Sequence, residues 1–84
     1  MKRINRILRP NEVQPYCGVR ATQRAELEAE GEFPKRVILR DGGRAIGWYE
    51  DEVADWQEYR RAKRDKIFTG NYQQWLASKQ SAAA

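Results

Sequence analysis

Apolar residues recur along the chain at helical and strand spacings, and glycines and prolines divide these stretches into separate elements. A first helix is expected over residues 10–17, because Pro10 suits a first helical position, where an N–H would have no partner. Pro15 removes a hydrogen bond inside this segment, so we expect the helix to be short, distorted or displaced. Gly18 then predicts a turn.

A second helix is expected over residues 21–30. Gly31 provides its stop signal, because glycine readily adopts the left-handed conformation with which many helices end. Pro34 prevents any continuation, since the residue before a proline avoids the α-helical region.

The next segment has the pattern of a β-hairpin. Residues 36–40 and 44–48 are strand-like and mostly apolar, and Asp41-Gly42-Gly43 between them suits a turn that requires positive φ angles. The strand period places Val37 with Leu39 on one face, and likewise Ile46 with Trp48.

Residues 50–66 predict the longest helix. Acidic side chains crowd its first turn and basic ones its last, which complements the helix dipole. Val53, Trp56 and Tyr59 recur at helical spacing and predict its buried stripe, so we expect Trp56, like Trp48, to lie in the core.

A short amphipathic segment follows the interruption at residues 69–71, with Tyr72, Trp75 and Leu76 on its apolar side. We predict that this side links protomers by self-association, and the alternative is that it folds back on its own domain. The expected organisation is a basic arm over 1–6, one domain over 7–66 and a tail over 67–84.

The composition indicates one small globular domain. The chain has 84 residues, and its three Trp, four Tyr and two Phe argue against disorder. No stretch approaches the ~20 apolar residues that span a bilayer, and no signal peptide is evident. The single cysteine, Cys17, lies among apolar residues and is expected in the core, where it forms no internal disulfide. We therefore expect a cytoplasmic protein that does not enter the membrane.

Charge is unevenly distributed along the sequence, with a net value of +4. Basic blocks at 1–9, 35–49 and 59–66 alternate with acidic segments at 10–34 and 50–58. Segregated positive blocks suit phosphate binding, although solvated faces and charged tails would produce the same pattern.

The residue types needed for common catalytic sites are missing. The chain has no histidine, which excludes Ser-His and Cys-His pairs and most zinc sites. No phosphate-cradling glycine motif occurs, and the carboxylates at 50–55 fit a helix start better than an acid–base pair. We therefore expect no enzymatic activity, no metal and no cofactor.

Several short motifs, taken in their order along the chain, resemble those of the AlpA-type phage regulators over about residues 7–65. These regulators group with the excisionases, or recombination directionality factors, and with MerR-like winged helix-turn-helix domains. These motifs are Leu8-Arg9-Pro10-Asn11-Glu12-Val13, Gly18-Val19, Glu30-Gly31-Glu32-Phe33-Pro34-Lys35, Gly43-Arg44-Ala45-Ile46-Gly47-Trp48, Glu52-Val53 and Trp56.

The resemblance implies an α+β, mostly helical, winged helix-turn-helix fold with a two-stranded hairpin wing and a C-terminal helix. It implies sequence-specific binding of double-stranded DNA by an excisionase or transcriptional regulator of a phage or integrative mobile element. The helix over 21–30 would enter the major groove, and the wing would reach the minor groove or backbone. Repeated adjacent sites and a site-specific integrase are the implied partners. The alternative, favoured by the acidic residues of that helix and by the apolar tail, is a protein-interaction module that binds DNA weakly.

The predicted DNA contacts lie at the start of the second helix and around the wing. Arginine and glutamine read guanine and adenine edges, whereas basic residues beside a wing suit phosphates or the minor groove. The alternatives are that the Arg24 stem covers the core and that the wing arginines pair with Asp41. The candidates are Arg20, Thr22, Gln23, Arg24, Lys35, Arg36, Arg40 and Arg44.

Overall fold

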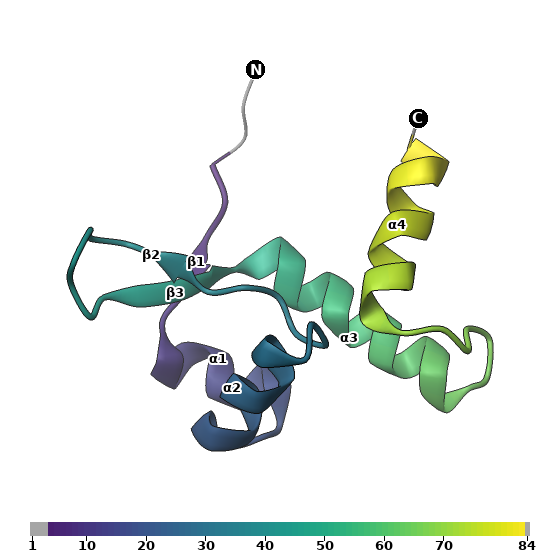
Figure 1. The fold of residues 1–84 in the computed structure, drawn as a ribbon, viewed down its shortest axis with the longest axis horizontal. Helices are drawn as coiled ribbons and strands as arrows, with labels where there is room; N and C mark the ends of the chain where they lie inside the picture. Colours follow the sequence, from purple (N-terminus) through teal and green to yellow (C-terminus); the bar gives the residue numbers. More distant parts are fainter. Residues whose placement is uncertain (1–3, 84) are drawn as a thin grey trace.

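The computed structural model describes residues 4–83, so Lys2 and Arg3 of the expected basic arm lie outside the described residues. It is mostly helical with one small antiparallel sheet (Figure 1), which confirms the expected fold class. The elements are β1 (Ile7–Leu8), α1 (Pro10–Cys17), α2 (Ala21–Ala29), β2 (Val37–Ile38), β3 (Ile46–Tyr49), α3 (Glu50–Arg64) and α4 (Tyr72–Ala83). Within the described range, no helix has the length and apolar character needed to cross a membrane.

Helix α1 has the expected bounds despite its internal proline. The Glu12 carboxylate accepts a hydrogen bond from the Arg9 backbone N–H at 3.0 Å and so caps the first turn. Pro15 is exposed and the helix continues past it to Cys17. Gly18 ends the helix in the left-handed region, with φ of +70°.

Helices α2 and α3 end in the same backbone motif but with different residues at the left-handed position. Gly31 has φ of +77°, and the next N–H, of Glu32, bonds to the Leu27 carbonyl at 2.8 Å. This is the stop signal expected at Gly31. In α3 the position is occupied by Lys66, with φ of +58°, and the Ile67 N–H bonds to the Ala62 carbonyl at 2.9 Å. A side chain is disfavoured in this conformation, so α3 ends with local strain.

The sheet has three strands in the order β1-β3-β2, one more than the expected hairpin. The extra strand, β1, pairs antiparallel with β3 and sets Ile7 opposite Tyr49. Its two residues are too few for a period-two pattern to predict. A side chain at Gly47 in β3 would collide with Ile7, so the third strand requires glycine there.

The core lies where the sheet, α1 and α3 meet the loop that follows α2. Phe33 stands edge-on to Trp56, with ring centroids 4.9 Å apart, and to Trp48 at 6.3 Å. The expected burial of Cys17, Trp48 and the α3 stripe is confirmed. The buried apolar residues that form the cluster are Leu8, Val13, Cys17, Phe33, Trp48, Val53, Trp56, Tyr59 and Tyr72.

Helix α4 folds back on the same core. Tyr72 is 2% exposed, its ring lies 5.3 Å from that of Tyr59, and Trp75 and Leu76 pack beside it. Figure 1 shows α4 returning across the far end of α3. The structure therefore supports the fold-back alternative for Tyr72, because its own chain already covers this side chain.

Glu32 joins the loop after α2 to both C-terminal helices. Its carboxylate accepts hydrogen bonds from the Tyr59 hydroxyl at 2.7 Å and the Tyr72 backbone N–H at 3.4 Å. Its carbonyl accepts one from the Trp56 indole at 2.8 Å. Burial, together with the bond to Glu32, raises the pKa of Tyr59 to about 12.

We predict that Trp56→Ala destabilises the domain by roughly 3–5 kcal/mol, because truncating a buried aromatic leaves a cavity. Urea unfolding followed by circular dichroism measures the change. Trp75→Ala is the matched control and should cost less, since Trp75 is only half buried. Equal losses would contradict the placement of Trp56 at the centre of the core.

We predict that Lys66→Gly raises the free energy of unfolding by about 1 kcal/mol, because glycine adopts positive φ without steric cost. Thermal unfolding measures the effect. Gly18→Ala tests the same principle in reverse, since its φ is +70° and a Cβ there meets no atom within 4 Å. It should destabilise the protein, and an unchanged midpoint for both variants would contradict the assignment of strain to Lys66.

Candidate nucleic-acid interface

Helix α2 presents its polar start to solvent. Arg20 is the residue before its first turn, and its side chain makes no capping hydrogen bond. Arg20, Thr22 and Gln23 are all exposed, as predicted contacts should be. The helix is held from its opposite side by Arg24, Leu27 and Glu28, of which Arg24 is the most buried.

Arg24 does not belong to the exposed set. It is 5% exposed, its guanidinium lies 4.9 Å from the centroid of the Trp48 ring, and Nη1 donates to the Gln14 side chain at 2.9 Å. This burial argues against the predicted DNA contact of Arg24, because the cation–π contact with the indole holds the side chain in the interior. The position of Arg24 agrees with the alternative that its side chain covers the core.

Arg36 is engaged by Glu28 of α2. Glu28 Oε2 accepts from Arg36 Nη2 at 2.7 Å, and Glu28 Oε1 accepts from the Arg36 backbone N–H at 2.9 Å. The hydrogen bond to Glu28 raises the pKa of Arg36 above its ordinary value. Arg36 is exposed, but its guanidinium already has a partner.

The hairpin loop carries two arginines that the structure leaves in solvent. Arg40 and Arg44 flank a turn in which Gly42 has φ of +72°, and the Gly43 N–H bonds to the Arg40 carbonyl at 2.9 Å. Over residues 4–83 no ion pair involves either arginine, so neither pairs with Asp41. Both have the exposure that a nucleic-acid contact requires.

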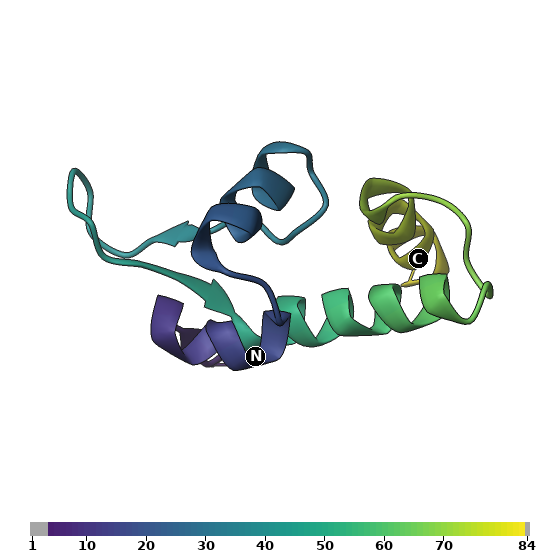
Figure 2. The same cartoon turned by 90° about the horizontal axis from the view of Figure 1, so that it is seen from below.

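The hairpin loop and α2 project to the same side of the molecule. Figure 2 shows both rising from the layer formed by α1 and α3, with the beginning of α2 directed toward the hairpin. The exposed predicted contacts that belong to these two segments are Arg20, Thr22, Gln23, Arg40 and Arg44. Lys35, also exposed, precedes β2 at the base of the hairpin.

The structure also shows that one of the three glutamates at 26, 28 and 30 turns inward. Glu26 and Glu30 are exposed, but the Glu28 side chain is only 10% exposed and is bound to Arg36. Sequence reasoning missed this role of Glu28. The spacing of Arg24 and Glu28, one helical turn apart on either side of Leu27, is the signal that could have shown them to share the inward face.

The basic run at the end of α3 lies far from this side. Figure 1 places that end opposite the hairpin. Lys63 donates to the Gly70 carbonyl at 3.1 Å and Arg64 pairs with Asp65 at 2.8 Å, which keeps the pKa of the Asp65 carboxyl below its ordinary value. These contacts stabilise the end of α3, and this basic run is not part of the candidate interface.

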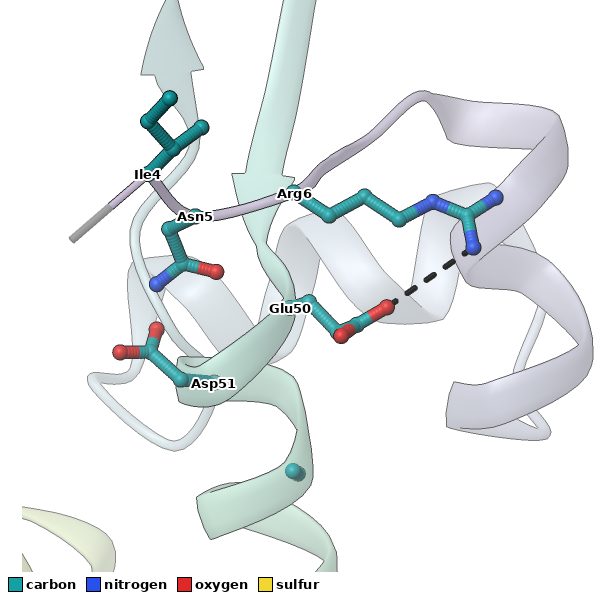
Figure 3. A pocket seen from close by; sticks show the side chains of 6 residues that line it. Ile4, Asn5, Arg6, Glu50 and Asp51 are labelled. Carbon is teal, nitrogen blue, oxygen red and sulfur yellow. Dashed lines mark ion pairs between the residues drawn. The ribbon is translucent and has the colours of Figure 1, made fainter.

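A hollow lies where β3 passes into α3 (Figure 3). It is lined by Ile4, Asn5, Arg6, Glu50, Asp51 and Ala54. Arg6 faces Glu50 across it at 3.8 Å and also binds Glu12 at 3.2 Å. The remaining carboxylate, Asp51, would repel phosphate, so the hollow is not part of the candidate interface.

Comparison with known proteins assigns the same region to one family. The model of the family described as prophage CP4-57 regulatory protein (AlpA) matches residues 6–61, from just before β1 to near the end of α3. An uncharacterised protein, ORF88 of enterobacteria phage P4, is 39% identical over 61 residues, covering 73% of this chain and 67% of that protein. No solved structure gives a significant match. The chain therefore belongs to the AlpA family of phage regulatory proteins.

Proposed function

We propose that the chain binds double-stranded DNA sequence-specifically, with α2 in the major groove and the hairpin on the adjacent minor groove or backbone. The observation that carries this proposal is the projection of α2 and the hairpin loop from one side of the fold. Helix α2 has nine residues. An α-helix with its side chains is about 10–12 Å across, which fits the roughly 12 Å width of the major groove.

The charge distribution along α2 favours entry by its N-terminal end. Arg20 and Gln23 lie there, together with the positive end of the helix dipole, and Gln23 can form a bidentate pair with adenine. Glu26 and Glu30 lie farther along the helix, so the end that enters the groove carries no carboxylate to repel phosphates. Thr22 adds a hydroxyl to the same end.

The basic residues outside α2 have separate roles in this proposal. Arg40 and Arg44 at the hairpin loop enter the minor groove or bind its phosphates, and Lys35 at the base binds the backbone. Base edges are then read mainly by α2, while the hairpin fixes the register of the protein on the duplex.

DNA binding by a member of this phage regulatory family would serve transcription, excision or both. As an excisionase the chain would act beside a site-specific integrase, and as a regulator it would act at a promoter. Electrophoretic assays with attachment-site DNA and with promoter DNA of the same element distinguish the two roles. A protein-interaction module would bind both DNAs only weakly, and the burial of Tyr72 weakens that alternative.

We predict that affinity for the preferred DNA falls steeply as salt rises, because each neutralised phosphate releases counterions and contributes a slope of about −0.9 to the log–log plot. Fluorescence anisotropy over a series of salt concentrations measures the slope. Unrelated duplex of equal length is the control and should bind more weakly. No binding to any duplex at low salt would refute the proposed function.

We predict that Arg44→Ala weakens DNA binding by about 1–3 kcal/mol with little change in the unfolding midpoint, because an exposed arginine in a groove contributes to affinity but not to packing. Arg64→Ala is the matched control, since it removes the same charge from the opposite end of the molecule. Equal effects of the two variants would show that only net charge matters and that the hairpin is not a specific contact.

A further inference from the structure

Helix α2 is attached to the rest of the fold with little apolar packing. Arg24 is its one buried residue, Leu27 is partly buried, and the Glu28 side chain is 10% exposed. Most helices of globular proteins are held by a hydrophobic stripe, which fixes their position against the core. In α2 polar contacts must supply much of that fixation.

Those polar contacts converge on the indole of Trp48 in β3, which is fully buried. Glu28 Oε1 accepts from the indole N–H at 3.3 Å, while the guanidinium of Arg24 lies 4.9 Å from the ring centroid. The guanidinium of Arg36, just before β2, lies 5.9 Å from the same centroid. Two side chains of α2, the carboxylate of Glu28 and the guanidinium of Arg24, thus contact the indole of Trp48 in the hairpin.

The Glu28–Arg36 pair completes the connection at the base of the hairpin. Glu28 binds both the backbone N–H and the guanidinium of Arg36, so it fixes the direction of the chain as well as the side chain. The planar fork of arginine makes this geometry specific in a way that lysine does not reproduce.

We propose that the Glu28–Arg36 pair is a positioning device that sets the orientation of the hairpin relative to α2. It lets the helix and the hairpin loop reach their grooves together. The inference rests on the proposed DNA binding. Arg36 then acts through Glu28 and not by binding phosphate, since a move toward DNA would leave a largely buried carboxylate without its partner.

The physical reason is that two linked contacts bind cooperatively only when their geometry matches the target. If the hairpin is free to rotate, the effective concentration of its arginines at the minor groove falls, although every contact residue is still present. Precise support of the contacting residues is what separates a functional site from one in which the same residues are loosely held.

The test is a thermodynamic cycle that combines Glu28→Gln with the hairpin variant Arg40→Ala/Arg44→Ala. In the otherwise unchanged chain, Glu28→Gln should weaken binding roughly five- to thirtyfold. In the hairpin variant the same substitution should cost no more than about twofold, because there is no longer a hairpin contact to position. Glu28 and the loop arginines do not touch, so a role confined to stability predicts no such coupling.

Two further variants separate positioning from charge. Glu26→Gln removes the same charge from an exposed position of α2 and should leave affinity unchanged or slightly higher, because it removes repulsion from phosphates. Arg36→Lys keeps the charge but loses the fork, and it should weaken binding like Glu28→Gln with an unchanged salt slope. If Arg36 instead bound a phosphate directly, Arg36→Lys would leave DNA affinity nearly unchanged. Arg36→Ala would then make the slope of log affinity against log salt shallower by about 0.9.

All affinities are measured at a temperature at which circular dichroism shows each variant folded. If Glu28→Gln does not fold, the Arg36→Lys variant replaces it in the cycle. Additive losses in the cycle, with normal binding by the unchanged chain, overturn the positioning role alone. Absence of DNA binding by the unchanged chain overturns the proposed function and this inference with it.

Discussion

The fold depends on the complete burial of Trp48, an indole whose N–H must still find an acceptor. Glu28 supplies that acceptor, and the need to do so turns one face of α2 toward the sheet. The face of the ring accepts Arg24, and Phe33 meets it edge-on, so that α2 and the loop that follows it both contact this side chain of β3. An apolar residue in place of Trp48 would fill the volume but would leave the Glu28 carboxylate with one donor fewer.

Three carboxylates accept hydrogen bonds that join one segment of the fold to another or cap a helix, although their charge alone suggests a position in solvent. Glu12 caps α1, Glu28 joins α2 to the hairpin, and Glu32 joins the loop after α2 to α3 and α4. Each satisfies at least one backbone donor as well as a side-chain donor. Glu28 and Glu32 are partly buried, and burying a carboxylate is unfavourable unless its hydrogen bonds are made, as these two make theirs. The surface around α2 is consequently less acidic than the count of its residues indicates.

Signals that act locally allowed much of the fold to be predicted from sequence. Gly18 and Gly31 end their helices as expected, because positive φ is a property of a single residue. The buried stripe of α3, Val53, Trp56 and Tyr59, was also predicted from sequence, since burial there follows the helical period. Strand β1 was missed because its pairing is a long-range property of two residues. The burial of Arg24 was given only as an alternative, because its charge suggested exposure. The docking of α4 depends on Glu32, forty positions before Tyr72, and no local pattern reports it.

The return of α4 onto the core affects how this protein can be shortened. The region shared with the family ends at residue 61, before α3 itself is complete. A fragment cut to that region would uncover the aromatic ring of Tyr59 and leave the Glu32 carboxylate facing solvent without the α4 backbone. Such a fragment would expose an aromatic surface that favours aggregation during expression and concentration. Minimal versions of this domain for spectroscopy or for fusion to other proteins should therefore retain the chain through α4.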